Sequence, residues 1–68
     1  MNNKEKNNAI RAVIAELRKK GFQYRIFWTV AGMKDYNFYH FMRGETSLKD
    51  NEIIAIEQYL TDVLNITI

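Results

Sequence analysis

The sequence contains no cysteine and no proline, and His40 is its only histidine. Without cysteine the chain can form no disulfide and offers no thiolate to a metal or a substrate. One histidine cannot build a cage of histidine and cysteine ligands, and no cluster of carboxylates replaces it along the chain. The sequence therefore predicts no metal site and no bound cofactor.

Long apolar runs and targeting segments are also missing. No apolar run approaches the roughly 18 residues of a membrane span, and no signal peptide opens the chain. We therefore expect a cytoplasmic protein without a membrane partner. Its 68 residues, 47% of them hydrophobic, suit one globular domain with one small core, and no repeat or low-complexity linker divides them.

The residues needed for catalysis are scarce. An enzyme requires a positioned nucleophile or an acid–base pair in a concave site. This chain offers one histidine, no glycine-rich phosphate loop and too little volume for a deep pocket. We expect no enzymatic activity and no catalytic residues.

The net charge is only +2, but it is unevenly distributed. Residues 1–44 carry nine lysines and arginines against three acids, whereas residues 45–68 carry one lysine and five acids, which gives +6 and −4. This asymmetry favours a basic face for a polyanion and an acidic segment elsewhere, although two ordinary solvated surfaces would look the same.

Apolar spacing predicts a first helix before Gly21. Its inner face consists of four residues spaced at i, i+3, i+4 and i+7: Ile10, Val13, Ile14 and Leu17. We expect Asn7 or Asn8 to cap its start and Gly21 to end it in a left-handed conformation. Residues 1–8 are then a flexible amino-terminal tail.

Two short helices are predicted next, at residues 23–31 and 35–42, and each ends at a glycine. In the first, Phe27 and Ala31 share a face, although the aromatic and β-branched residues there would also suit a strand. In the second, Asp35 is the expected cap. Its core face consists of Phe38, Phe41 and Met42.

A fourth helix is predicted to begin near Ser47 or Asp50, where these two residues resemble a capping box with aspartate in place of glutamate. Its inner stripe consists of Ile53, Ile56, Leu60, Val63 and Leu64. Residues 65–68 are expected to form a carboxy-terminal tail, as coil or a short strand.

A short helix, a tight turn at a glycine and a second short helix form the helix-turn-helix unit. In repressors of the phage repressor and Cro type, apolar or small residues flank that glycine and recur in both helices. The residues at those places here are Phe27, Ala31, Gly32, Met33, Phe38 and Phe41. The chain therefore resembles this family over residues 10–64. It departs from the family at Trp28, where alanine is usual and the two helices cross closely.

The resemblance implies an all-α fold of four to five helices, a lambda-repressor-like helix-turn-helix domain over residues 9–64. It also implies a sequence-specific DNA-binding transcriptional regulator, working as a homodimer on double-stranded operator DNA with residues 35–43 in the major groove. Arg43 could pair with guanine, and Asn37 with adenine if it faces outward. Tyr36, Tyr39 and His40 could donate to phosphates or pack on thymine methyl groups, and the remaining candidates could contact phosphates. The candidate DNA-binding residues are Arg25, Lys34, Tyr36, Asn37, Tyr39, His40, Arg43, Thr46, Ser47 and Lys49. The fourth helix and residues 65–68 are the expected dimer surfaces.

These candidates also have ordinary structural explanations. In this interpretation His40 is an ordinary surface histidine, and the tyrosines cover the small core. Arg43 then interacts with the negative end of the helix dipole. A second functional hypothesis is a small phage-type modulator that binds another regulatory protein, because eight of the nine aromatic residues lie between Phe22 and Phe41. The two hypotheses differ in whether the tyrosines and Trp28 form one exposed patch or are buried.

Overall fold

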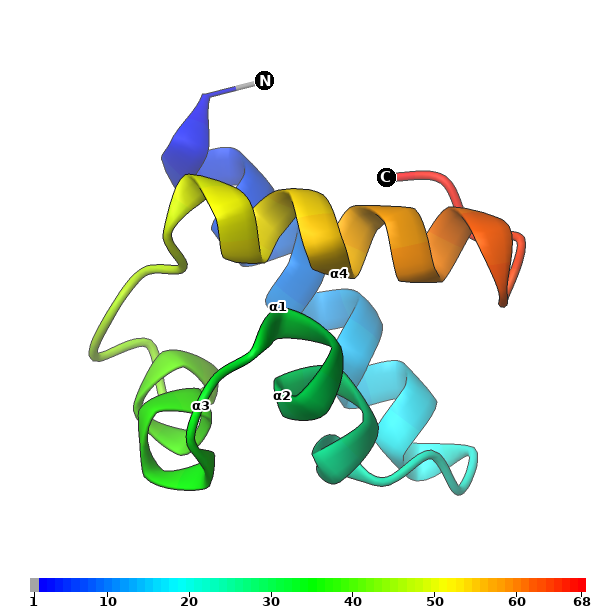
Figure 1. The fold of residues 1–68 in the computed structure, drawn as a ribbon, viewed down its shortest axis with the longest axis horizontal. Coiled ribbons are helices and arrows are strands. Elements are labelled where there is room, and N and C mark those ends of the chain that lie inside the picture. The colour runs from blue at the N-terminus through cyan, green and yellow to red at the C-terminus, as the bar shows by residue number, and fades with distance from the viewer. Residues whose placement is uncertain (1) are drawn as a thin grey trace.

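The computed structural model describes residues 2–68, and within that range the chain forms four helices and no strand. They are α1 (Asn3–Lys19), α2 (Tyr24–Ala31), α3 (Asp35–Met42) and α4 (Asp50–Asp62). In Figure 1, α4 lies across the top of the molecule, and α2 and α3 lie below it. The all-α class is confirmed, and the strand considered for residues 23–31 is not formed.

All four helices contribute to one hydrophobic core. Its buried side chains are Ile10, Ile14, Leu17, Phe27, Ala31, Phe38, Phe41, Leu48, Ile53, Ile56 and Leu60. Most of the predicted inner-face residues are thus confirmed as buried, whereas Val13, Met42 and Leu64 are only partly buried against the core. One prediction is wrong: Val63 is 61% exposed. Val63 was predicted to continue the stripe of α4, but the helix ends at Asp62 and the chain turns away through Asn65, whose φ is 56°.

The start of α1 differs from the prediction. Asn2 is its cap, and the Asn2 side chain accepts a hydrogen bond from the Glu5 amide at 2.8 Å. Residues 3–8, predicted within the flexible tail, are therefore helical. Asn7 was a candidate cap, but its side chain is buried against the segment before α4, where it accepts a hydrogen bond from the Leu48 amide at 2.7 Å.

Two other predicted caps are also wrong. The cap of α3 is Lys34, and Asp35 is the first helical residue, whose carboxylate accepts from the Tyr36 amide at 2.7 Å. Helix α4 begins at Asp50, one of its two predicted starts, but Lys49 and not Ser47 is its cap. Glu52 accepts a hydrogen bond from the Lys49 amide at 2.8 Å, which is half of a capping box. The lysine ammonium has no lone pair and cannot supply the other half.

Glycines end α2 and α3 by the same local geometry. Gly32 has φ of 69°, its amide donates to the Thr29 carbonyl at 3.2 Å, and the Met33 amide donates to the Trp28 carbonyl at 2.8 Å. Gly44 repeats this arrangement after α3 with φ of 80°. Both are Schellman turns, which favour glycine because other residues are strained at such φ values. The predicted ends of both helices are confirmed.

Trp28 lies half-buried along the flank of α3. Its ring centroid is 6.0 Å from that of Phe38 and 5.8 Å from that of Tyr39. The contact between α2 and α4 is more extensive than that between α2 and α3. The indole of Trp28 therefore packs against two aromatic residues of α3.

The segment after α4 is coil and folds back along that helix, as Figure 1 shows. The Ile66 amide donates to the Leu60 carbonyl at 2.8 Å. Ile66 and Ile68 are half-buried against the core. The predicted tail is thus part of the packed domain.

Candidate nucleic-acid interface

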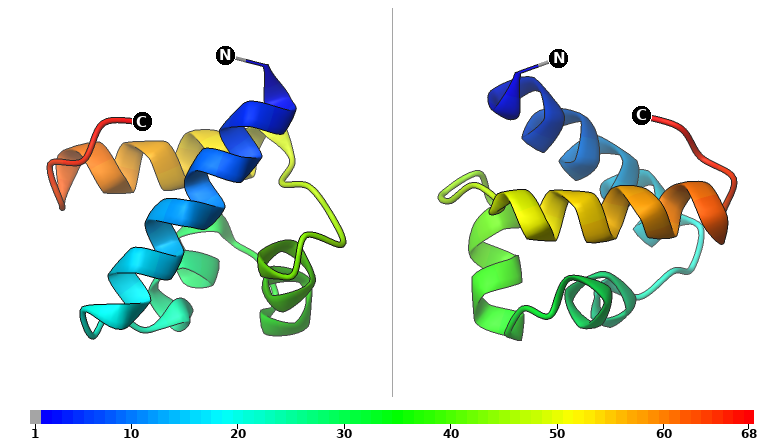
Figure 2. Two further views of the ribbon diagram at one scale, coloured as in Figure 1. Left: turned by 180° about the vertical axis from the view of Figure 1, so that it is seen from behind. Right: turned by 45° about the horizontal axis from the view of Figure 1, so that its top comes forward.

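Helix α3 lies at one edge of the molecule in both views of Figure 2. Phe38 and Phe41 are fully buried and fasten its inner face to the core. On its outer face, Tyr36 is 57% exposed and Tyr39 41% exposed. Nine of the ten predicted site residues are exposed, and His40 is half-buried. The surface placement expected of these residues is therefore found; their role in DNA binding stays a prediction.

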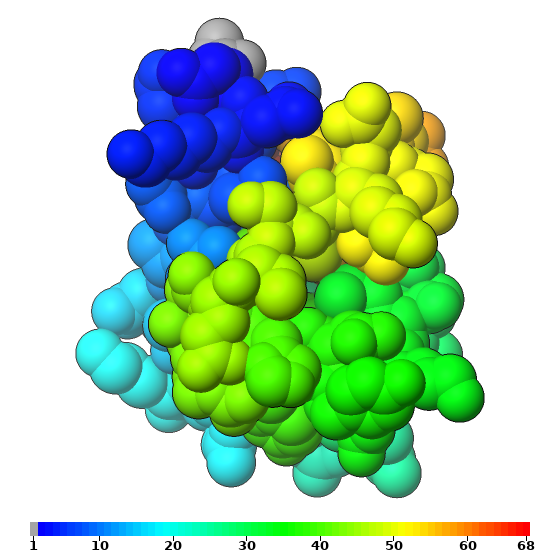
Figure 3. All heavy atoms as spheres, turned by 90° about the vertical axis from the view of Figure 1, so that its left-hand side faces the viewer, coloured from blue at the N-terminus to red at the C-terminus, as the bar shows by residue number. Residues whose placement is uncertain are grey.

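Several of the predicted residues come together beside α3. Figure 3 faces the edge formed by α3 and the segment that leads to α4. A shallow hollow of about 290 Å³ lies between these two parts of the chain. Its lining includes four predicted site residues, Asn37, Thr46, Ser47 and Lys49, together with Met33 and Glu52. Polar side chains from α3 and from the following loop thus share one surface.

Arg25 and Tyr39 belong to a second hollow, on the side of α3 that faces α2. It measures about 420 Å³. The other residues of its lining are Arg18, Gln23, Tyr24 and Trp28. This hollow is basic and aromatic and contains no carboxylate. Of the remaining predicted residues, Lys34 and Tyr36 belong to neither hollow.

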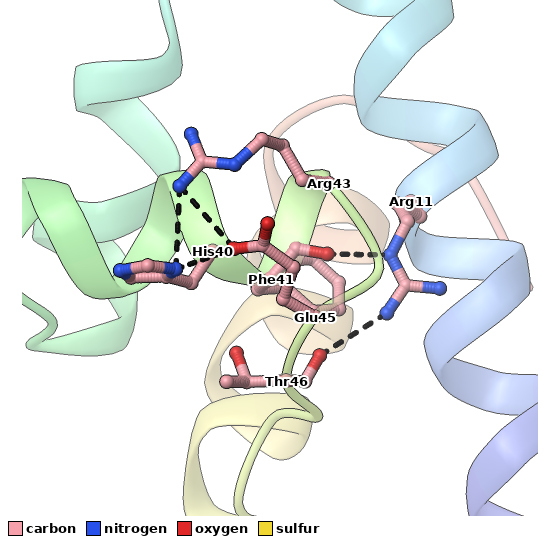
Figure 4. Close-up of polar contacts among 6 residues, drawn as sticks. All are labelled: Arg11, His40, Phe41, Arg43, Glu45 and Thr46. Atoms are coloured by element: carbon pink, nitrogen blue, oxygen red, sulfur yellow. Dashed lines mark hydrogen bonds and ion pairs between the residues drawn. The ribbon is translucent and has the colours of Figure 1, made fainter.

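His40 and Arg43 meet at the end of α3 around a residue that sequence reasoning missed, Glu45. Figure 4 shows the three side chains converging. Nδ1 of His40 lies 2.5 Å from Oε1 of Glu45, and Nη2 of Arg43 lies 3.3 Å from the same oxygen. Nη2 of Arg43 also lies 3.2 Å from Nδ1 of His40.

The direction of the hydrogen bond between His40 and Glu45 follows from the chemistry of the carboxylate. A carboxylate can only accept, so Nδ1 of His40 carries the proton and donates it to Glu45. Arg43 donates to Glu45 as well. It does not donate to His40, because a protonated Nδ1 has no lone pair to accept a hydrogen bond. The hydrogen bond from His40, followed by that from Arg43, lowers the pKa of the Glu45 carboxyl below its usual value of 4.5.

Arg11 on α1 is a second residue that sequence reasoning missed. Its Nε donates to the Phe41 carbonyl at 2.6 Å, and its Nη2 donates to the Thr46 carbonyl at 3.3 Å. The guanidinium carbon lies 4.5 Å from the centre of the Phe41 ring, so the charge also sits over an aromatic face. Arg11 thereby joins α1 to the end of α3 and to the loop that follows (Figure 4).

No local pattern identifies Arg11 or Glu45 in advance. Arg11 acts 30 residues away in the sequence, through backbone carbonyls that every residue has. Glu45 reaches His40 only because the turn at Gly44 brings the chain back, and its amide donates to the His40 carbonyl at 3.0 Å. An acidic residue just after a helix-ending glycine, with histidine five residues earlier, is the one signal the sequence holds.

The aromatic residues are divided between core and surface. Tyr24 and Trp28 are half-buried, whereas Tyr36 and Tyr39 are exposed. The Tyr39 ring centroid lies 5.9 Å from that of Tyr24 and 5.8 Å from that of Trp28. Neither extreme considered from the sequence holds: Tyr39 extends a half-buried cluster to the surface.

Residues 2–68 contain neither a metal-binding cluster of side chains nor a helix that could span a membrane. No three histidine, aspartate or glutamate side chains come together as they would around a metal ion. Across the same residues, the helices are too short or too polar to span a bilayer.

Comparisons with protein-family models, with curated proteins and with solved structures found no match to this chain.

Proposed function

We propose that this protein is a sequence-specific DNA-binding regulator of the phage repressor and Cro type, with a lambda-repressor-like helix-turn-helix formed by α2 and α3. The observation that carries the proposal is the pair of eight-residue helices joined through Gly32, the second of which keeps a polar, exposed face at the edge of the molecule. A helix enters the major groove only if one side of it is free of the protein's own packing. Phe38 and Phe41 fasten the opposite side of α3 to the core.

The charges around α3 support contact with a duplex. Arg25, Lys34 and Lys49 are exposed, at the start of α2, the start of α3 and the start of α4. Basic side chains at helix ends beside a recognition helix suit phosphate contacts, which fix its register on the duplex. Asn37 and Arg43 then have the hydrogen-bonding groups that distinguish adenine and guanine in the major groove.

Binding of the purified protein to a pool of random duplexes tests this proposal. Retention should fall as salt rises from about 50 to 200 mM, because phosphate contacts release counterions. Sequencing of the retained DNA should show an enriched palindrome if a homodimer binds a two-fold operator. Arg43→Ala should relax one base position, whereas Lys20→Ala, at the far end of α1, should not. Lack of retention at the lower salt concentration would exclude direct DNA binding.

The second candidate function is capture of another regulatory protein by an aromatic face. The observation that favours it is the aromatic hollow, in which the half-buried rings of Tyr24 and Trp28 and the exposed ring of Tyr39 lie beside two arginines, Arg18 and Arg25. Aromatic residues and arginines are the residues most often found at the centre of protein interfaces. Trp28→Ala would then abolish binding of the protein partner, whereas Lys49→Ala would have no effect.

A further inference from the structure

Glu45 is the carboxylate on which two predicted DNA-binding residues, His40 and Arg43, converge. Oε1 of Glu45 accepts hydrogen bonds from Nδ1 of His40 at 2.5 Å and from Nη2 of Arg43 at 3.3 Å. All three side chains are about half exposed, with side-chain exposures of 45% for His40, 55% for Arg43 and 51% for Glu45. The contact therefore lies on the surface that would meet a duplex and not in the core.

The backbone on either side of Glu45 is fixed. The Glu45 amide donates to the His40 carbonyl at 3.0 Å, in the turn at Gly44. Arg11 binds the chain before and after it, at the Phe41 carbonyl and the Thr46 carbonyl, at 2.6 and 3.3 Å. A carboxylate on such a backbone is held in place before any ligand arrives, as a positioning group must be.

The contact leaves the hydrogen-bonding groups of Arg43 and His40 only partly used. Nη2 of Arg43 donates to the Glu45 carboxylate, and the other amino group of the guanidinium points away from it in Figure 4. Nε2 of His40 has no partner among the described hydrogen bonds of this side chain. Arg43 therefore keeps donors for the paired acceptors of a guanine edge.

The charge of Glu45 opposes the alternative use of the same side chains. A carboxylate within hydrogen-bonding distance of Arg43 and His40 repels the phosphate oxygens that either would otherwise bind. The carboxylate does not repel the amino group of cytosine, because carboxylates accept hydrogen bonds from that group in the major groove. The three residues together thus favour a G·C base pair over the DNA backbone.

We propose that Glu45 is a positioning and specificity-determining residue, which holds Arg43 and His40 for contact with a G·C base pair and keeps them from binding phosphates without regard to sequence. This inference rests on the proposed DNA-binding function.

Glu45→Gln tests it, because glutamine keeps the size and an acceptor oxygen but removes the charge. Asp62→Asn, at the far end of α4, is the matched control for net charge. In Glu45→Gln we expect tighter binding to random duplex and a plot of log affinity against log salt that is steeper by about 0.9, the effect of one added phosphate contact. The preference for G·C at one position should fall about fivefold or more. Asp62→Asn should change neither the salt slope nor the preference.

A measurement without DNA separates this inference from the proposed function. The ¹⁵N chemical shifts of His40 should report a proton on Nδ1 in the neutral wild-type side chain, and loss of that preference in Glu45→Ala. The same tautomer in both proteins would overturn the contact and the inference with it. Failure of the wild type to bind any duplex would overturn both proposals. Binding by the wild type with an unchanged base preference and salt slope in Glu45→Gln would overturn this inference alone.

Discussion

Two side chains of α1, Asn7 and Arg11, hold the segment between α3 and α4 in place. Asn7 is only 3% exposed. Its side-chain oxygen accepts from the Leu48 amide at 2.7 Å, and its side-chain nitrogen donates to the Asn3 carbonyl at 2.7 Å. Arg11 binds the Phe41 and Thr46 carbonyls. The loop that carries Thr46, Ser47 and Lys49 is thereby positioned by residues outside α2 and α3.

Asn7→Ala should destabilise the fold by about 1–3 kcal/mol, because the buried Leu48 amide loses its acceptor. Chemical denaturation measures the change in the free energy of unfolding. Asn51→Ala, an exposed substitution of the same type on α4, is the control and should change it by at most about 0.5 kcal/mol. Equal effects of the two substitutions would contradict the role given to Asn7.

The Glu45 carboxyl gives a prediction about pH. Hydrogen bonds from His40 and Arg43 lower its pKa in the folded protein below 4.5. A carboxyl whose pKa is lower in the folded than in the unfolded state stabilises the fold above the unfolded pKa and ceases to do so as the pH falls through the folded pKa. The stability of the wild type should therefore exceed that of Glu45→Gln most clearly above about pH 4.5, and the difference should shrink as the solution becomes more acidic. Side-chain NMR titration that placed the Glu45 midpoint at or above 4.5 would contradict this.

At the scale of helices, the ends of α2 and α3 depend on the left-handed glycines Gly32 and Gly44. A Cβ atom at Gly32 would meet no other atom within 4 Å, so substitution there changes backbone strain and not packing. Gly32→Ala should cost about 1–2 kcal/mol, the penalty of a left-handed conformation for an L-residue. Gly32→Asn should cost less, since asparagine tolerates this region better. Denaturation that found alanine equal to glycine would contradict the assignment.

The helices themselves could be predicted from the sequence because their inner faces repeat with the helical period. Phe27, Phe38 and Ile56 are each buried where that period places them. Helix starts could not be predicted as well. Asn7 has the chemistry of a cap, but its partner is the Leu48 amide, 41 residues away in the sequence. A local sequence pattern carries no information about a partner so far along the chain, and it therefore does not identify the true cap, Asn2.

The candidate site likewise has features that the sequence predicts and contacts that it does not. The exposure of Tyr36, Asn37 and Arg43 follows from the same period that buries Phe38 and Phe41. The contacts of Arg11 and Glu45 depend on how α1 meets α3 and on the backbone path through Gly44. Such contacts arise only when the helices are packed, and they decide how Arg43 is held.

At the scale of the whole molecule, the proposed homodimer requires a surface away from α3. Ile54 on α4 is 55% exposed, on the helix that lies across the opposite side of the domain in Figure 1. Ile54→Lys should weaken self-association measured by analytical ultracentrifugation, because it places a charge where an apolar side chain would be covered. Thr29→Lys, at an exposed position on α2, is the control and should leave self-association unchanged. Equal self-association in both variants would exclude α4 as the dimer surface.

The most direct measurement is NMR mapping of the amide groups during titration with a short DNA duplex at low salt. Binding through the helix-turn-helix predicts the largest shifts or losses of signal in α3, in the loop at residues 43–49 and at the start of α2. The outer face of α4 should change little on addition of DNA. Changes confined to α4, or no changes at any duplex concentration, would contradict the central claim that α3 is a DNA-contacting helix.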